Sequence, residues 1–157
     1  ARTMPRLDAE RIGLWREFGT IATALQRRID EALVEEFELP LSWFEVLTSI
    51  RAAGGSMRVH ELCQALGEVP SSLSRRLDRM EDEGFLRRRH APRADDRRAV
   101  VVQITSQGRG VWRDANITYR RMVQRLFAQR LSDTDLAALV RVWGKLAEGL
   151  RAEAPSD

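Results

Sequence analysis

An arginine-rich segment near the middle of the chain carries the densest charge in the sequence. Between Arg87 and Arg98 there are six arginines and two aspartates, a local balance of +4 (6 − 2), whereas the whole chain has a net charge of +3. A basic patch this concentrated on a nearly neutral protein favours an anionic partner that meets one face. The segment runs on into alternating β-branched residues up to Thr105, which predicts that a hairpin of two strands presents the arginines.

A second group of polar residues lies on the helix predicted just before this segment. That helix is expected from Pro70, a residue suited to the first helical position, to about Glu83. Leu73, Leu77 and Met80 form its apolar stripe. The rest of its surface can bring hydroxyl and guanidinium groups to bases and phosphates. These residues are Ser71, Ser72, Ser74, Arg75, Arg76 and Arg79. Taken alone, the helix fits a solvated face equally well; the basic hairpin that follows favours DNA.

Helices and strands expected around these residues define the fold class as mainly α with a small β-hairpin. Apolar periodicity predicts helices over 8–36, 41–53, 59–66, 70–83, 106–130 and from 132 onwards, and strands over 85–89 and 99–105, with a short extended piece open at 56–58. The helices 59–66 and 70–83 form a helix-turn-helix, whose second helix enters the DNA major groove. The hairpin that follows is a wing. We expect one domain over 1–157, with the winged helix-turn-helix at about 40–105.

The first predicted helix is long for a chain of this size. About 28 residues at 1.5 Å each span roughly 42 Å, and its apolar residues recur at helical spacing. A helix that extends beyond its own domain usually packs on another molecule, often a second copy. We therefore expect dimerisation helices at about 8–36 and 106–153 and a homodimer.

The stretch SSLSRRLDRMEDEGFLRRR, followed by DDRRAVVVQIT and a long helix, resembles the MarR family of winged-helix transcriptional regulators. The family pattern is a recognition helix ending in Leu-Glu-x-x-Gly-Leu, then Asp-x-Arg before a β-branched strand ending in Leu-Thr. This sequence departs from it mildly, with Met80, Phe85 and Ile104 in place of leucine. The resemblance implies a cytoplasmic homodimer that binds a pseudo-palindromic operator in double-stranded DNA, usually as a repressor.

One of the two aspartates among the wing arginines, Asp96, can be explained as a partner of a DNA-contacting arginine. An arginine inserted into the narrow minor groove is attracted by its negative potential but loses conformational freedom. A carboxylate two residues earlier can hold the guanidinium in place beforehand. The resemblance implies that Arg98 is the minor-groove arginine and Asp96 its brace. We add Arg88 and Arg97 as DNA contacts; Asp95 is left as a turn residue.

A small aromatic or phenolic effector is the further expectation from the resemblance, held between the dimerisation helices and the winged unit. The candidate residues are four aromatic side chains that could form the apolar walls of a pocket and two side chains that could be its polar partners. Aromatic side chains at helical spacing are equally explained as ordinary core. They are Trp15, Phe18, Trp43 and Phe44, with Arg16 or His60. The alternative is a regulator without an effector, acting as an activator or through protein contacts.

Other classes of function find little support. There is no GxGxxG, P-loop or HExxH, and the two histidines lie on different elements, so we expect no enzyme and no cofactor. Cys63 is the single cysteine, which excludes an internal disulfide. With His60 it offers only two metal ligands, a poor site, so we expect no metal and a buried Cys63. No apolar run approaches the ~18 residues of a membrane span, and we expect a cytoplasmic protein without a membrane partner.

Overall fold

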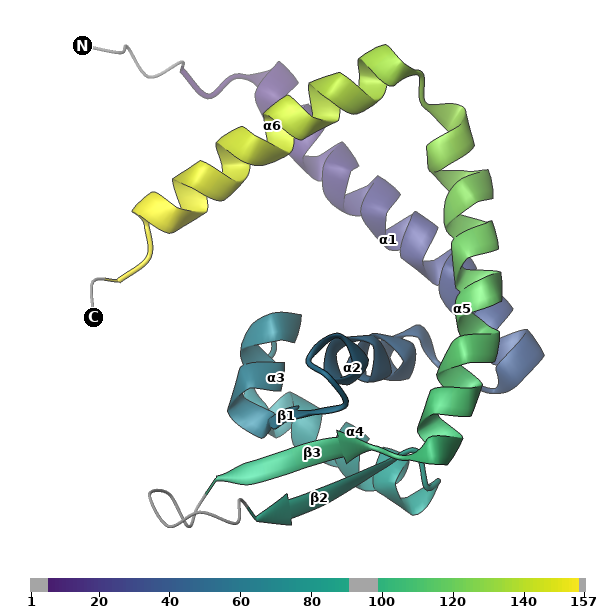
Figure 1. Cartoon of the computed structure of the whole chain (residues 1–157). Coiled ribbons are helices and arrows are strands. Elements are labelled where there is room, and N and C mark those ends of the chain that lie inside the picture. The colour runs from purple at the N-terminus through teal and green to yellow at the C-terminus, as the bar shows by residue number, and fades with distance from the viewer. Residues whose placement is uncertain (1–5, 91–98, 156–157) are drawn as a thin grey trace. The chain divides into compact units, whose positions relative to one another are not determined.

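The computed structural model describes residues 6–90 and 99–155 of the chain. Helices dominate, with a small antiparallel sheet (Figure 1), which confirms the predicted fold class. The elements are α1 (Ala9–Phe37), α2 (Leu41–Ala52), β1 (Ser56–Arg58), α3 (Val59–Leu66), α4 (Pro70–Asp82), β2 (Leu86–His90), β3 (Val100–Ile104), α5 (Ser106–Leu126), the 3-10 helix η1 (Ala128–Arg130) and α6 (Asp133–Ala152). The chain divides into two compact units, Ala1–Arg120 and Arg121–Asp157.

The sheet of the first unit has three strands in the order β1-β3-β2, all antiparallel. The short extended piece at 56–58 is therefore a strand, which pairs with β3 on the side opposite β2. Side chains alternate between the two faces of a strand. Leu86, Val102 and Ile104 are accordingly buried, whereas Arg87 and Gln103 between them are exposed.

The core of the first unit lies between this sheet and helices α2, α3 and α4. The buried residues come from all of these elements and include the predicted stripe of α4. They are Val46, Leu47, Ile50, Leu62, Cys63, Leu73, Leu77, Met80, Leu86, Val102 and Ile104. Cys63 is 6% exposed, which confirms the expectation of a buried cysteine. Burial of one face of α4 fixes the orientation of its opposite face.

Two glycines permit the close packing between the end of α4 and the start of α5. Gly84 has φ +82°, the left-handed conformation in which glycine carries no steric penalty, and it ends α4. Thr105 Oγ1 donates to the Gly84 carbonyl (2.6 Å) and accepts from Gly108 N–H (3.0 Å), so it caps α5. A Cβ at Gly108 would overlap the Phe85 carbonyl oxygen. The first turn of α5 thus lies directly against the α4–β2 turn.

Helix α1 is the predicted long helix, but most of its apolar stripe is not covered within the first unit. Asp8 caps it by accepting from Arg11 N–H (2.8 Å), and only Ile29 and Leu33 are buried among its residues. Trp15 and Phe18 are 70% and 47% exposed. The C-terminal half of α1 therefore packs on its own unit, whereas the N-terminal half presents an apolar surface.

The second unit contains the end of α5, η1 and α6. A single helix over 106–130 was the prediction, and it is wrong at its end: α5 stops at Leu126 and a 3-10 turn follows. The predicted capping box of α6 is confirmed, since Ser132 Oγ accepts from Asp135 N–H (3.2 Å) and Asp135 accepts from Ser132 N–H (2.9 Å). No α6 residue is buried. None of the helices in the described part of the chain combines the length and the hydropathy that a membrane span needs.

Candidate nucleic-acid interface

Helix α4 presents a polar face opposite its buried stripe. The side chains of Ser71, Ser72, Ser74, Arg75 and Arg79 are all exposed. Small hydroxyls near the start of the helix permit close approach, and an arginine offers a planar, bidentate donor to a guanine edge or a phosphate. The acidic residues Asp82 and Glu83 lie at the C-terminal end of α4, away from the serines of its first turn. The composition of this face is compatible with major-groove contact.

Arg88 does not share the outward orientation of its neighbours in β2. Alternation along the strand places it on the same side as the buried Leu86, and its guanidinium pairs with Asp78 (2.5 Å) and Glu81 (3.5 Å) of α4. Its backbone N–H also donates to the Glu81 carboxylate. Arg88 therefore links the wing to α4 through ion pairs. Contact of Arg88 with DNA stays a prediction.

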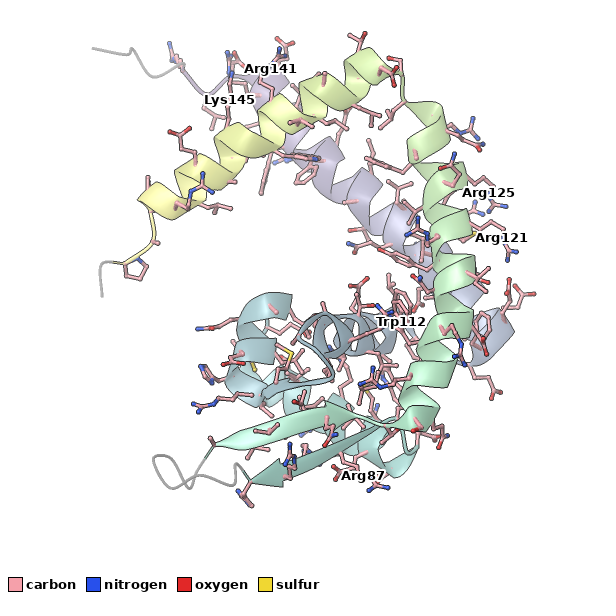
Figure 2. The ribbon with its side chains drawn as sticks, in the orientation of Figure 1. Arg87, Trp112, Arg121, Arg125, Arg141 and Lys145 are labelled. Atoms are coloured by element: carbon pink, nitrogen blue, oxygen red, sulfur yellow. The ribbon has the colours of Figure 1, made fainter. Side chains whose placement is uncertain are left out.

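Arg87 and Arg89 are exposed on the other side of β2, and Arg87 points outward from the sheet in Figure 2. Asp78 and Glu81 of α4 both pair with Arg88. The exposed guanidinium groups of Arg87 and Arg89 can meet an anion. Asp96, Arg97 and Arg98, the predicted wing-tip contacts and brace, lie outside the described residues.

Arg76, which the sequence predicts as a DNA contact, is also held by a carboxylate. Both of its terminal nitrogens donate to Glu68, each at 2.7 Å, across the turn between α3 and α4. The two side chains are only 17% and 29% exposed. Hydrogen bonds from Arg76 lower the pKa of the Glu68 carboxyl below its usual value, so the pair is charged at neutral pH. Its position fixes the turn of the helix-turn-helix; contact of Arg76 with DNA stays a prediction.

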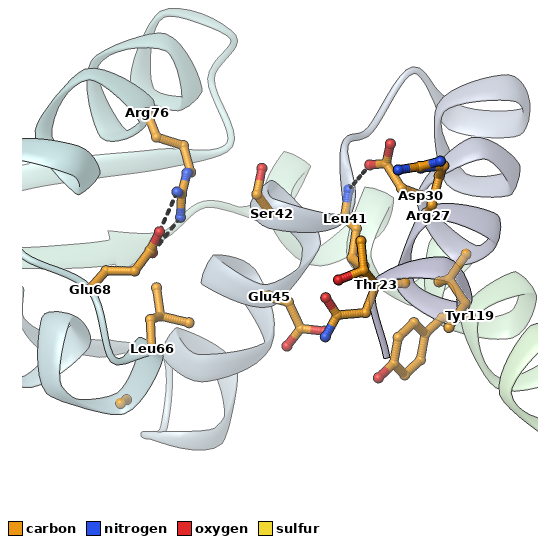
Figure 3. A pocket seen from close by; sticks show the side chains of 13 residues that line it. Thr23, Arg27, Asp30, Leu41, Ser42, Glu45, Leu66, Glu68, Arg76 and Tyr119 are labelled. Carbon is orange, nitrogen blue, oxygen red and sulfur yellow. Dashed lines mark hydrogen bonds and ion pairs between the residues drawn. The ribbon is translucent and has the colours of Figure 1, made fainter. Parts of the chain in front are cut away.

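A cavity of about 730 Å³ lies in the first unit between helices α1, α2 and α5 and the α3–α4 turn (Figure 3). Its volume falls in the ~300–1,000 Å³ range of small-molecule sites. The lining residues come from five segments of the chain. They are Thr23, Gln26, Arg27, Ile29, Asp30, Leu41, Ser42, Glu45, Ala65, Leu66, Glu68, Arg76 and Tyr119. The cavity therefore reaches α4 through Arg76.

The carboxylates that line this cavity differ in whether they form hydrogen bonds or ion pairs with the protein. Asp30 accepts from Leu41 N–H (2.8 Å), which joins α1 to α2, and Glu68 is paired with Arg76. Glu45 forms no hydrogen bond or ion pair with the residues that the structure describes, and burial raises the pKa of its carboxyl. Burial, and the nearby charge of Glu45, also raise the pKa of the Tyr119 phenol. Glu45 is the half-buried carboxylate left to interact with a ligand.

The six residues predicted to hold an effector do not line this cavity and do not meet at one place. Trp15 and Phe18 contact each other on α1, with ring centres 6.3 Å apart, and Arg16 lines a separate hollow on the same helix. Trp43 packs edge-on against Phe85 (6.1 Å). Their role in ligand binding stays a prediction.

Two more of the six have other surroundings. Phe44 is 1% exposed and lies parallel to the ring of Trp112 (6.2 Å) and at a tilt to the ring of Tyr119 (4.6 Å). It therefore contacts Tyr119, which lines the cavity, without lining the cavity itself. His60 is exposed on α3 and borders a different hollow beside Cys63. No group of three or more metal-ligating side chains is found in 6–90 and 99–155.

Reasoning from sequence missed the polar lining of the cavity. Gln26, Asp30, Glu45 and Tyr119 are spread over three helices, and each reads locally as part of a solvated helix face. The one available signal was Tyr119, a lone tyrosine on the apolar stripe of the fifth predicted helix. Its partners in space were not deducible, because they follow from how α1, α2 and α5 pack.

Known proteins share both the sequence and the architecture. Residues 39–100 match the sequence model of the MarR family. The HTH-type transcriptional regulator YhbI of Bacillus subtilis is 30% identical over 127 residues, 79% of this chain and 80% of that protein. The structure of Sco3205, a MarR family regulator from Streptomyces coelicolor in complex with DNA, has a TM-score of 0.85 at 25% identity and covers 99% of this chain and 95% of that one. A mutant of MarR from E. coli complexed with operator DNA has a TM-score of 0.78 at 26% identity, over 90% and 99% of the two chains. The chain therefore belongs to the MarR family and is a DNA-binding transcriptional regulator.

Proposed function

We propose that this regulator binds a pseudo-palindromic operator as a homodimer, represses transcription there and is released by a small ligand. The observation that carries the proposal is the division of α4. Leu73, Leu77 and Met80 are buried against the core, while Arg75 and Arg79 are exposed with the serines of the first turns. A helix anchored in this way can enter the major groove as a rigid body and present the same side chains to each operator.

Exposed apolar surfaces on two helices support a homodimer. On α1, Leu14, Trp15 and Ile21 are 59%, 70% and 57% exposed. On α6, Val140 and Leu150 are 72% and 74% exposed. Apolar stripes of this extent usually mark an interface between proteins. A second copy offers the same stripes, and two-fold symmetry would set two α4 helices about one helical turn, ~34–36 Å, apart on one DNA face.

Release by a ligand is proposed for the 730 Å³ cavity. A molecule bound among α1, α2 and α5 would contact the segment around Glu68 and Arg76, which sets the turn before α4. Its binding energy could thus favour one orientation of α4 over another. Repression is proposed because the family pattern implies it. An activator, or a regulator without an effector, is the alternative.

Selection of genomic DNA by the purified protein tests operator binding. The selected fragments should share an inverted repeat whose half-site centres lie about 10 base pairs apart, and light scattering should give the mass of a dimer. The affinity should fall with salt by about 0.9 log units per phosphate contact for each log unit of salt. Selected DNA without an inverted repeat, or a monomer in solution, would contradict the proposal. A promoter fusion carrying the selected operator then distinguishes repressor from activator.

A further inference from the structure

We propose that the cavity between α1, α2 and α5 takes a small aromatic cation, such as an amidinium or a protonated amine, with the Glu45 carboxylate as its counter-ion. This inference rests on the proposed function in one respect, because it takes this cavity to be the ligand site. It specifies the charge of the ligand, and it departs from the phenolic class that the family resemblance implies.

The Glu45 carboxylate is accessible to a ligand in the cavity. Its side chain is half-buried on α2 and lines the cavity near Tyr119 (Figure 3). It has no hydrogen bond or ion pair within the described part of the chain. Every fully buried side-chain nitrogen or oxygen there has a hydrogen-bond partner, so the unpaired Glu45 oxygens are not fully buried. Because Glu45 lines the cavity, a ligand in the cavity can reach them. Desolvation raises the pKa of this carboxyl, and a bound cation would offset that cost by pairing with it.

The balance of charges around the cavity also favours a cation. Three carboxylates and two guanidinium groups line it. Arg76 is already paired with Glu68 through two hydrogen bonds, and Asp30 is occupied by a backbone N–H. Arg27 is exposed and also borders a neighbouring hollow on α1. The lining thus carries a net charge of −1 (2 − 3), because the backbone N–H at Asp30 does not neutralise that carboxylate. Glu45 is the carboxylate of the lining that has no hydrogen bond or ion pair within the described residues.

The apolar part of the lining argues for an aromatic group. Ile29, Leu41 and Leu66 provide aliphatic walls. The Tyr119 ring is held in place by Phe44, with ring centres 4.6 Å apart. An aromatic face attracts a cation through its quadrupole, so the ring and the Glu45 carboxylate favour the same charge. An anionic ligand would instead place like charges together in a partly desolvated site.

Three isosteric probes test the proposal by calorimetric titration of the full chain: benzamidine, benzamide and benzoate, which are cationic, neutral and anionic at pH 7. We expect benzamidine to bind most tightly and benzoate least. Glu45→Gln should weaken benzamidine binding about ten-fold or more, the scale of one charge-assisted hydrogen bond, and should leave benzamide nearly unchanged. Glu35→Gln, an exposed carboxylate on α1 outside the cavity, is the matched control and should change neither.

A second variant keeps the test decisive if Glu45→Gln does not fold. Glu45→Asp retains the charge and should retain the preference for benzamidine over benzoate. Preference for benzoate in the unmodified protein, equal benzamidine affinity in Glu45→Gln, or no binding of any probe at millimolar concentration would each overturn the inference. None of these results would affect operator binding. If benzamidine binds through Glu45 but does not release the selected DNA, the inference holds and the proposed release by ligand fails.

Discussion

The pair formed by Arg76 and Glu68 joins α4 to the turn before it, so its removal should destabilise the first unit. The perturbation is Glu68→Gln, which keeps the shape of the side chain but removes its charge. Both terminal nitrogens of Arg76 donate to this carboxylate at 2.7 Å. The variant leaves the guanidinium half-buried with a weaker acceptor, and Arg76→Gln leaves the carboxylate without its cation.

The loss of unfolding free energy can be estimated from the burial of the pair. Exposed pairs contribute about 0–1 kcal/mol, and hydrogen bonds to charged groups about 1.5–3 kcal/mol. With side-chain exposures of 17% and 29%, the pair lies between these cases, at about 1–2 kcal/mol. At roughly 2–4 °C per kcal/mol for a chain of this length, Tm should fall by about 2–8 °C at fixed protein concentration.

The stabilisation by this pair should depend on pH in a defined direction. Arg76 lowers the pKa of the Glu68 carboxyl in the folded protein. The stabilisation is therefore complete above the unfolded pKa of about 4.3 and is lost as the pH falls through the lower folded value. Calorimetry should show a full Tm difference between the unmodified protein and Glu68→Gln at pH 7, and a shrinking one below about pH 4.3.

A double-mutant cycle with Arg76→Gln decides whether the two residues act on each other. We expect a coupling free energy of about 1 kcal/mol or more at pH 7. A coupling of zero, or a Tm difference that grows on acidification, would refute the reasoning. A salt slope reduced by about one in Arg76→Gln alone would show that Arg76 contacts a phosphate.

Three further outcomes are expected. Gly108→Ala should lower the free energy of unfolding by about 1–3 kcal/mol, because its Cβ would overlap a backbone carbonyl. Gly110→Ala should be tolerated, because its Cβ would meet only a side-chain nitrogen at 3.8 Å. Urea titration of the two variants compares their stabilities. Val140→Asp, on the exposed face of α6, should shift light scattering towards a monomer, and an unchanged dimer would place the interface elsewhere. Arg88→Ala should lower both Tm and DNA affinity, since it removes the ion pair to α4. Arg87→Ala should lower DNA affinity alone. Equal losses of Tm in the two variants would contradict this difference.

Local periodicity allowed much of the fold to be predicted. The stripe of Leu73, Leu77 and Met80 and the capping box at Ser132 depend on residues within one or two helical turns, and both are present. The end of α5 was missed because the apolar pattern continues past the point where the backbone leaves the helix, at Phe127.

Pairings between distant segments were not deducible. Residues 56–58 become a strand only because β3 is available as a partner, more than forty positions along the chain. Arg88 differs from Arg87 and Arg89 because strand alternation turns it towards Asp78 of α4. The cavity likewise needs Glu45 and Tyr119 to meet across two helices. In each case the residue type was visible in the sequence, but its partner depended on packing.

Sequence discrimination by α4 is the most direct test of the central claim, that this helix reads the operator. The measurement is a fluorescence anisotropy titration of Arg75→Ala against the selected operator and a scrambled duplex, with Arg28→Ala, an exposed arginine of α1, as the charge-matched control. The account predicts a loss of about 1–3 kcal/mol on the operator and a reduced ratio between the two duplexes, while Arg28→Ala keeps the ratio. An unchanged ratio in both Arg75→Ala and the corresponding Arg79→Ala variant would contradict it.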